Sequence, residues 1–262
     1  MSANNPPKRV VILAGGQGTR LSEETAVRPK PMVEIGGRPI LWHIMKIYAH
    51  FGLTDFIVCV GYKGHVVKEY FDHYRLYASD VTYDLGNNVK TIHRGETEPW
   101  RVTIVETGNG TGTGGRLRYL NDYLQGADFC LTYGDGVADI DISKLLECHD
   151  REGRLATVTA VRPPARFGAI ESDGNRVVRF EEKPRASAGW INGGFFVLSG
   201  EVLKYVANDA TSFELDCLVK LAQDCQLTAY HHHGFWQAMD TLRDHRQLEE
   251  MWSIGQAPWK VW

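Results

Sequence analysis

The sequence of 262 residues lacks the long apolar runs and the dense basic clusters that are typical of several protein classes. No apolar stretch approaches the roughly 20 residues of a membrane-spanning helix, which argues against a membrane protein. A formal net charge of −3, without a run of lysines and arginines, gives no indication of nucleic-acid binding. The first residues, MSANNPPKR, lack the apolar core of a secretory signal. We therefore expect residues 1–7 to form a disordered tail.

Cysteine is scarce, and its positions do not predict disulfides. The 5 cysteines are scattered along the chain and contain no C-x-x-C motif. This pattern favours reduced, structural thiols in a cytoplasmic protein. The histidine run at 231–233 does not predict a metal site either, because consecutive residues of an extended segment point to opposite faces.

Two phosphate-binding motifs are absent in their full form. The dinucleotide fingerprint needs a third glycine three residues after Gly18, but Leu21 stands there. This absence argues against a nicotinamide-dependent oxidoreductase. The Gly-Lys-Ser/Thr that ends a P-loop is also missing from this turn.

The chain has a different glycine turn, at the end of a buried strand predicted over Val10–Ala14. Gly15, Gly16 and Gly18 allow tight turns and a close approach of a ligand to the backbone, and successive N–H groups of such a turn bind anions. Thr19 and Arg20 then add a hydroxyl and a guanidinium suited to phosphate oxygens.

Lys30 follows between two prolines, which restrict the backbone around its charge. Together with the glycine turn and Arg20, it indicates a polyphosphate site. The alternative is a purely structural turn flanked by solvated surface charges.

The rest of the chain predicts an α/β fold of 8–262 as a single domain with a mostly parallel sheet. Helices are expected over 40–51, 65–74, 117–124, 142–149, 214–223 and 241–252, and strands over 56–60, 129–133, 156–161, 166–170, 177–180 and 194–198. Residues 79–112 break this rhythm, and we expect them to form an insertion of antiparallel strands or long loops.

Three further segments carry candidate site residues. The second glycine turn, 108–116, either is a flexible linker or binds a nucleotide at the start of the next helix. Asp135 lies between two glycines where a strand ends, and Asp240 precedes a helix that Thr241 and Asp244 open. Asp135 could reach a cation; alternatively, it is only a turn residue.

These segments together resemble the sugar-1-phosphate nucleotidylyltransferases. The resemblance runs from 8 to 262 and covers, among other blocks, LAGGQGTRLSEET, RPKPMVEIGGRPILWHI, TGGRL, TYGDGVAD, RFGAI, EEKP, INGGFFVL and FWQAMDTLRD. The blocks TGGRL and FWQAMDTLRD favour the cytidylyl branch of this family. The resemblance implies a doubly wound, Rossmann-like nucleotidyltransferase fold.

The resemblance also implies roles for particular residues. The triphosphate would be bound by Gly15, Gly16, Gly18, Thr19 and Arg20, with Lys30 at the α-phosphate. The base and ribose would contact Leu13, Ala14, Thr113, Gly114, Gly115 and Arg116. Mg²⁺ would be bound by Asp135 and Asp240. The sugar phosphate would be bound by Gly168, Glu182, Lys183, Asn192 and Gly193. Arg20, Lys30 and Asp135 are the residues expected to carry the chemistry.

The implied substrates are CTP and glucose 1-phosphate. A uridylyl- or thymidylyltransferase acting on a hexose 1-phosphate is the alternative. A regulatory subunit without activity should have lost Lys30 or an aspartate, and this chain keeps all three. A homo-oligomer is implied as well, with a hexamer among the candidates and the 79–112 insertion as part of the interface.

Overall fold

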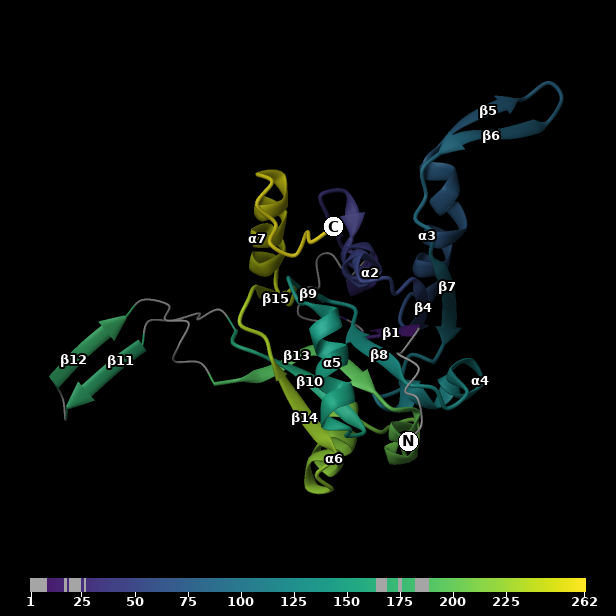
Figure 1. Cartoon of the computed structure of the whole chain (residues 1–262). Coiled ribbons are helices and arrows are strands. Elements are labelled where there is room, and N and C mark those ends of the chain that lie inside the picture. Colours follow the sequence, from purple (N-terminus) through teal and green to yellow (C-terminus); the bar gives the residue numbers. More distant parts are fainter. Residues whose placement is uncertain are drawn as a thin grey trace.

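The computed structural model describes residues 9–16, 18, 25, 27–163, 169–173, 176–181 and 189–262 (Figure 1). The tail expected at 1–7 lies outside these residues, so it stays a prediction.

The centre of the fold is a 7-stranded sheet in the order β14-β10-β13-β8-β1-β4-β7. Its strands are β1 (Arg9–Ala14), β4 (Asp55–Val60), β7 (Arg101–Glu106), β8 (Phe129–Tyr133), β10 (Ala156–Val161), β13 (Ile191–Leu198) and β14 (Leu227–His231). Strand β13 runs antiparallel to β8 and β10, whereas the remaining neighbours pair in parallel. The prediction of a mixed, mostly parallel sheet is confirmed.

Alternate residues of β1 enter different cores on the two faces of this sheet. Val10 and Ile12 pack in one core with residues of α2 (Ile40–His50). Val11 and Leu13 pack in the other with Leu117 and residues 213–221. A strand buried on both faces is apolar at every position, which explains the continuous run VVILA. The doubly wound arrangement is confirmed.

The other α-helices of the described residues are α3 (Gly64–Tyr77), α4 (Asn121–Leu124), α5 (Ile142–Glu152), α6 (Val219–Gln223) and α7 (Leu242–Ser253). The helix expected over 214–223 begins as a π-helical segment, Phe213–Leu218, that continues into α6. Helix α7 begins with the predicted capping box of Thr241 and Asp244. In the part of the chain that the structure describes, no helix is long and apolar enough to cross a membrane.

The insertion expected at 79–112 is only partly antiparallel. Strands β5 (Ser79–Asp84) and β6 (Val89–Gly95) form an antiparallel hairpin that projects from the end of α3 (Figure 1). The expectation for 102–105 was wrong, because β7 pairs in parallel with β4 and belongs to the central sheet. Strand β7 lies at the edge of that sheet, and most of its residues are only partly buried. Its sequence therefore alternates like that of an antiparallel strand.

Three short antiparallel pairs complete the fold. They are β2 (Glu34–Ile35) with β3 (Arg38–Pro39), β11 (Ala169–Asp173) with β12 (Arg176–Glu181), and β9 (Gly136–Ala138) with β15 (Trp236–Ala238). The β9–β15 pair matters for the site, because Asp135 precedes β9 and Asp240 follows β15. In addition, Met239 N donates to Asp135 O at 2.8 Å. The two aspartates, distant in sequence, are thereby brought together.

Candidate active site

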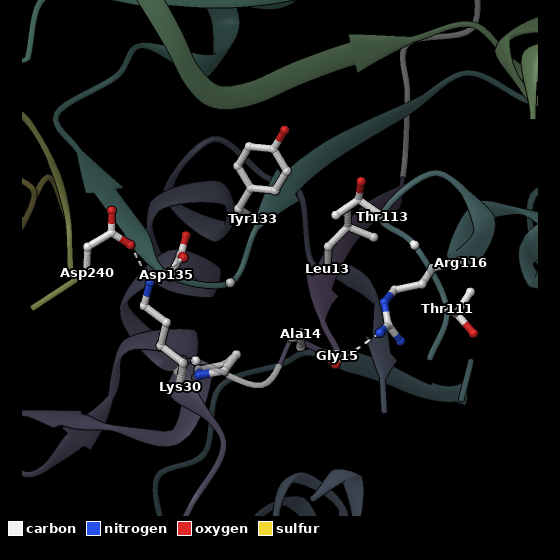
Figure 2. Close-up of a pocket in the computed structure, with 15 residues that line it drawn as sticks. Leu13, Ala14, Gly15, Lys30, Thr111, Thr113, Arg116, Tyr133, Asp135 and Asp240 are labelled. Atoms are coloured by element: carbon white, nitrogen blue, oxygen red, sulfur yellow. Dashed lines mark hydrogen bonds and ion pairs between the residues drawn. The ribbon is translucent and has the colours of Figure 1, made fainter. Parts of the chain in front are cut away.

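The candidate site lies where β1 and β8 end side by side. Leu13 is paired with Tyr133 in the parallel register, and Gly134 N donates to Leu13 O at 3.0 Å. The glycine turn after β1 is therefore next to Asp135, at the edge of the sheet where ligands of such folds bind. A cavity of about 450 Å³ opens there (Figure 2).

Most of the residues predicted to bind nucleotide or metal meet in this cavity. They are Leu13, Ala14, Gly15, Gly16, Gly18, Lys30, Thr113, Arg116, Asp135 and Asp240. Gly114 and Gly115 belong to the same turn as Thr113 and pack against residues 209–213. Thr19 and Arg20 lie outside the described residues.

Lys30 bridges the two predicted aspartates. Its Nζ lies 2.7 Å from Asp135 Oδ2 and 2.6 Å from Asp240 Oδ1, and the lysine side chain is only 12% exposed. Burial by itself lowers the pKa of Lys30, but the two carboxylates outweigh burial and raise that pKa above its ordinary value. The ammonium is therefore charged at neutral pH.

The backbone holds Lys30 in this position. Residues 30–32 form a short 3-10 turn that Pro29 precedes, and Met32 N donates to Pro29 O at 2.8 Å. Pro31 is buried against Gly134. The prolines on both sides of Lys30 thus belong to a hydrogen-bonded turn that packs against the end of β8.

The aspartate pair fits a divalent cation. Both carboxylates contact one cationic atom, the Nζ of Lys30, so both can also face one metal ion. Carboxylate oxygens are ligands that Mg²⁺ accepts, and it commonly takes its other ligands from water and substrate phosphates. Within the described residues there is no group of three or more metal-ligating side chains. A metal at the aspartate pair would therefore take its remaining ligands from water or from substrate phosphates.

The second glycine turn is tied to the segment that precedes α6. Gly112 N donates to Asp209 O at 2.8 Å, Gly115 N to Thr211 O at 3.0 Å, and Phe213 N to Thr113 Oγ1 at 2.9 Å. These bonds contradict the interpretation of this turn as a flexible linker. Thr113 and its neighbours Thr111 and Gly112 line the same cavity as Leu13 and Ala14.

Arg116 is buried beneath the first glycine turn, with 4% of its surface exposed. Its guanidinium donates to Gly15 O and Gly108 O, each at 3.0 Å, and to Thr107 Oγ1 (Figure 2 shows the contact with Gly15). Burial lowers the pKa of Arg116 from its ordinary value. The residue thus joins the ends of β1 and β7, and Gly15 leaves room for it, because a Cβ at this position would lie 2.1 Å from Arg116 Nη1 and the guanidinium would have to shift.

A second cavity, of about 220 Å³, adjoins the first and shares Tyr133, Asp135 and Asp240 with it. The predicted sugar-phosphate residues Asn192 and Gly193 line this second cavity. The other residues predicted for this role, Gly168, Glu182 and Lys183, lie outside the described residues.

The sequence did not single out Tyr133, Trp236 or Glu214. Tyr133 lines both cavities, and Trp236 lines the smaller one and donates from Nε1 to Gly193 O at 2.7 Å. The position of Tyr133 directly before Gly-Asp-Gly was a usable signal. Glu214 reaches the site through tertiary contacts, and no local motif marks it.

Comparisons with known proteins give a consistent result. The model of the family described as Nucleotidyl transferase matches residues 9–250. The chain is 54% identical over 255 residues to the glucose-1-phosphate cytidylyltransferase of Salmonella typhi, covering 97% of this chain and 99% of that protein. It is 44% identical over 255 residues to a probable glucose-1-phosphate cytidylyltransferase of Bacillus subtilis, covering 97% and 100%.

A solved structure adds a likeness in fold. HddC from Yersinia pseudotuberculosis, complexed with GMP-PN, matches with a TM-score of 0.67 and 26% identity. The match covers 94% of this chain and 99% of that one.

Proposed function

Since the chain belongs to the nucleotidyl transferase family and is a nucleotidyltransferase, we propose that it transfers the cytidylyl group of CTP to α-D-glucose 1-phosphate. The products would be CDP-glucose and diphosphate. The observation that carries the proposal is the pair of adjoining cavities that share Tyr133, Asp135 and Asp240. The relatives at 54% and 44% identity, both named as glucose-1-phosphate cytidylyltransferases, support the choice of substrates.

In the proposed reaction, an oxygen of the sugar phosphate attacks the α-phosphorus of CTP in line. A new P–O bond forms while the bond from the α-phosphorus to the oxygen of the leaving diphosphate breaks. The second pKa of a phosphate monoester is near ~6, so the nucleophile is already ionised at pH 7 and needs no general base. The protein must instead align two polyanions and offset their repulsion.

Lys30 is the group to which we assign charge stabilisation at the α-phosphate. It enters the larger cavity from a braced turn and is held protonated by the two carboxylates. Asp135 and Asp240 would hold Mg²⁺, which supplies further positive charge at the phosphates when bound. Arg20 stays a predicted triphosphate ligand.

The base would lie between the end of β1 and the turn 111–116, which both line the larger cavity. Cytosine differs from uracil in its N4 donor and N3 acceptor. A site that recognises cytosine therefore needs an acceptor oxygen facing N4 and a hydrogen-bond donor facing N3. Uracil would leave both groups without a partner, and each mismatch costs roughly 1–3 kcal/mol.

A matrix of nucleotides against sugar phosphates tests the proposal. CTP, UTP, dTTP, ATP and GTP are each incubated with several sugar 1-phosphates, and diphosphate release is measured. We expect the highest kcat/KM for CTP with glucose 1-phosphate. Equal values for CTP and UTP, or a preference for UTP or dTTP, would instead identify a uridylyl- or thymidylyltransferase.

We also propose that the active form is a cytoplasmic homo-oligomer, with the β5–β6 hairpin as part of its interface. The hairpin carries Tyr83, Leu85 and Val89 in exposed positions and projects away from the sheet (Figure 1). Isolated two-stranded hairpins are marginally stable in water, so packing against a second copy would stabilise this one.

A further inference from the structure

The carboxylate of Glu214 connects three separate segments around the two cavities. Tyr133 Oη donates to Glu214 Oε1 at 2.5 Å. Thr113 Oγ1 and Ser212 Oγ donate to Glu214 Oε2 at 2.6 and 3.0 Å. Hydrogen bonds to an ionised acceptor are short and about twice as strong as neutral ones, so these contacts hold their donors firmly.

The two closest donors lead to different parts of the site. Thr113 belongs to the turn that lines the larger cavity. Tyr133 lines both cavities, and Figure 2 shows its ring between Thr113 and the aspartate pair. Glu214 therefore contacts Thr113, which lines the larger cavity, and Tyr133, which lines both cavities.

The direction of each hydrogen bond follows from the chemistry of the carboxylate. An ionised carboxylate only accepts, so the Tyr133 hydroxyl must donate to it and can then accept from Asn192 Nδ2 at 3.1 Å. Asn192 Oδ1 in turn accepts from Gly194 N at 2.8 Å. The amide of Asn192, a predicted sugar ligand, is thereby held at its oxygen by Gly194 N and at its nitrogen by Tyr133 Oη.

Glu214 is itself held in place. It lies in the first turn of the π-helical segment, a type of helix that is often found at functional sites. Ser212 caps this segment by accepting from Leu215 N at 3.1 Å, and Ser212 N donates to Asp216 Oδ2 at 2.7 Å. The adjacent Phe213 is fully buried against Phe196.

We propose that Glu214 is a positioning residue that aligns the nucleotide turn through Thr113 and the sugar side through Tyr133 and Asn192. The inference rests on the proposed assignment of the two cavities to nucleotide and sugar phosphate. Glu214 acts through its hydrogen-bond donors, and it couples the two substrates without a role in the chemical step.

Kinetics of three variants test this role. In Glu214→Gln the side-chain amide nitrogen donates, so at least one hydroxyl loses its acceptor. We expect the KM for both substrates to rise on the order of tenfold, with a smaller change in kcat. Tyr133→Phe should raise only the KM for the sugar phosphate, and Thr113→Val only the KM for the nucleotide.

The double variant Tyr133→Phe/Glu214→Gln adds a test of coupling. Because both changes act on one chain of hydrogen bonds, the KM for the sugar phosphate should rise no further than in the worse single variant. Glu201→Gln is the matched control, since Glu201 is exposed and pairs with Lys204 on the surface. Thermal unfolding of every variant checks that it is folded.

Several results would overturn the proposal. They are KM values of Glu214→Gln that match those of Glu201→Gln, equal effects of Tyr133→Phe on both substrates, or additive effects in the double variant. If Glu214→Gln does not fold, the KM values of Tyr133→Phe and Thr113→Val still test the proposal, because each should rise for one substrate only. All assays use the nucleotide that the wild type uses best, so a preference for UTP would refute CTP specificity and leave this test intact.

Discussion

At the scale of single residues, Lys30 shows how one side chain can serve two purposes. Its ammonium neutralises two carboxylates that would otherwise repel each other, and it also lines the cavity proposed for the nucleotide. A cation bound between Asp135 and Asp240 would compete with Lys30 for the same oxygens. Binding of Mg²⁺ would therefore free the ammonium for the phosphates.

Replacing Lys30 by alanine tests its charge. If the ammonium stabilises charge at the α-phosphate, Lys30→Ala should lower kcat on the order of 10²–10³-fold, the effect of one preorganised electrostatic group. Steady-state kinetics with saturating substrates measure this loss. Lys204→Ala, on an exposed surface, is the control and should behave like the wild type. A change confined to the KM of Lys30→Ala would show that the residue only binds substrate.

The aspartates are tested by replacing each carboxylate with an amide. Asp135→Asn and Asp240→Asn keep the size of the side chain but remove a charge that the proposed Mg²⁺ would need, so each should abolish Mg²⁺-dependent turnover. The readout is diphosphate release over a range of Mg²⁺ concentrations, with thermal unfolding to confirm the fold. A variant that keeps nearly the wild-type kcat at saturating Mg²⁺ would show that its aspartate is not a metal ligand.

At the scale of elements, the strands that lie inside the sheet were the most predictable. Strands β1, β4 and β8 are buried on both faces, so each contains a run of three or more consecutive apolar residues that predicts a strand. The edge strand β7 was wrongly predicted to belong to the antiparallel insertion. Its partial exposure gives its sequence the alternation that is typical of an antiparallel strand. For the hairpin β5–β6 the sequence left antiparallel strands and long loops as alternatives, and the structure shows antiparallel strands.

Charges placed on this hairpin test the proposed interface. The double variant Leu85→Lys/Val89→Lys puts ammonium groups on side chains that are 88% and 52% exposed in the single chain. If they are buried between copies, desolvation of the charges should lower the assembly to a smaller species. Light scattering coupled to size-exclusion chromatography measures the mass.

Ile254, which lies outside the hairpin, provides a control with an exposed apolar side chain. Ile254 is 60% exposed after α7, so Ile254→Lys should leave the assembly as it is in the wild type. A monomeric wild type, or a hairpin variant with wild-type mass, would contradict the proposal for β5–β6.

At the scale of the whole molecule, the site combines what local sequence can predict with what only the fold provides. The glycine turn and Gly-Asp-Gly could be placed because both follow strands whose carboxyl ends meet at one edge of the sheet. The contact of Glu214 with Thr113 and Tyr133 depends on how residues 209–218 pack against the second glycine turn. No periodicity or motif encodes that packing.

The fold is closed by the C-terminal residues, which return to α2. Trp259 is fully buried, and its Nε1 donates to His43 Nδ1 at 3.3 Å. His43 Nε2 lies 2.9 Å from Ile35 O, to which it must donate if Nδ1 accepts. The neutral imidazole thus connects the C-terminal segment to the β2–β3 turn, and protonation of Nδ1 would remove the acceptor of Trp259.

This arrangement predicts a loss of stability in acid. Burial lowers the pKa of His43 to about 4 from its ordinary value of 6.5. Between these values the unfolded chain binds a proton that the folded chain excludes, so the free energy of unfolding falls as the pH decreases from about 6.5 to about 4. The full loss from His43 is roughly 3 kcal/mol, at about 1.4 kcal/mol for each pH unit.

The test compares the wild type with His43→Gln, which keeps a donor and an acceptor but does not titrate. Urea unfolding is followed at steps from pH 7 to about pH 4. His149 is also buried with a lowered pKa and destabilises in the same direction, so both proteins should lose stability in acid. The loss should be smaller in His43→Gln, because only the wild type must exclude a proton from this imidazole. If the free energy of unfolding falls equally with pH in the two proteins, His43 does not contribute to the loss of stability in acid.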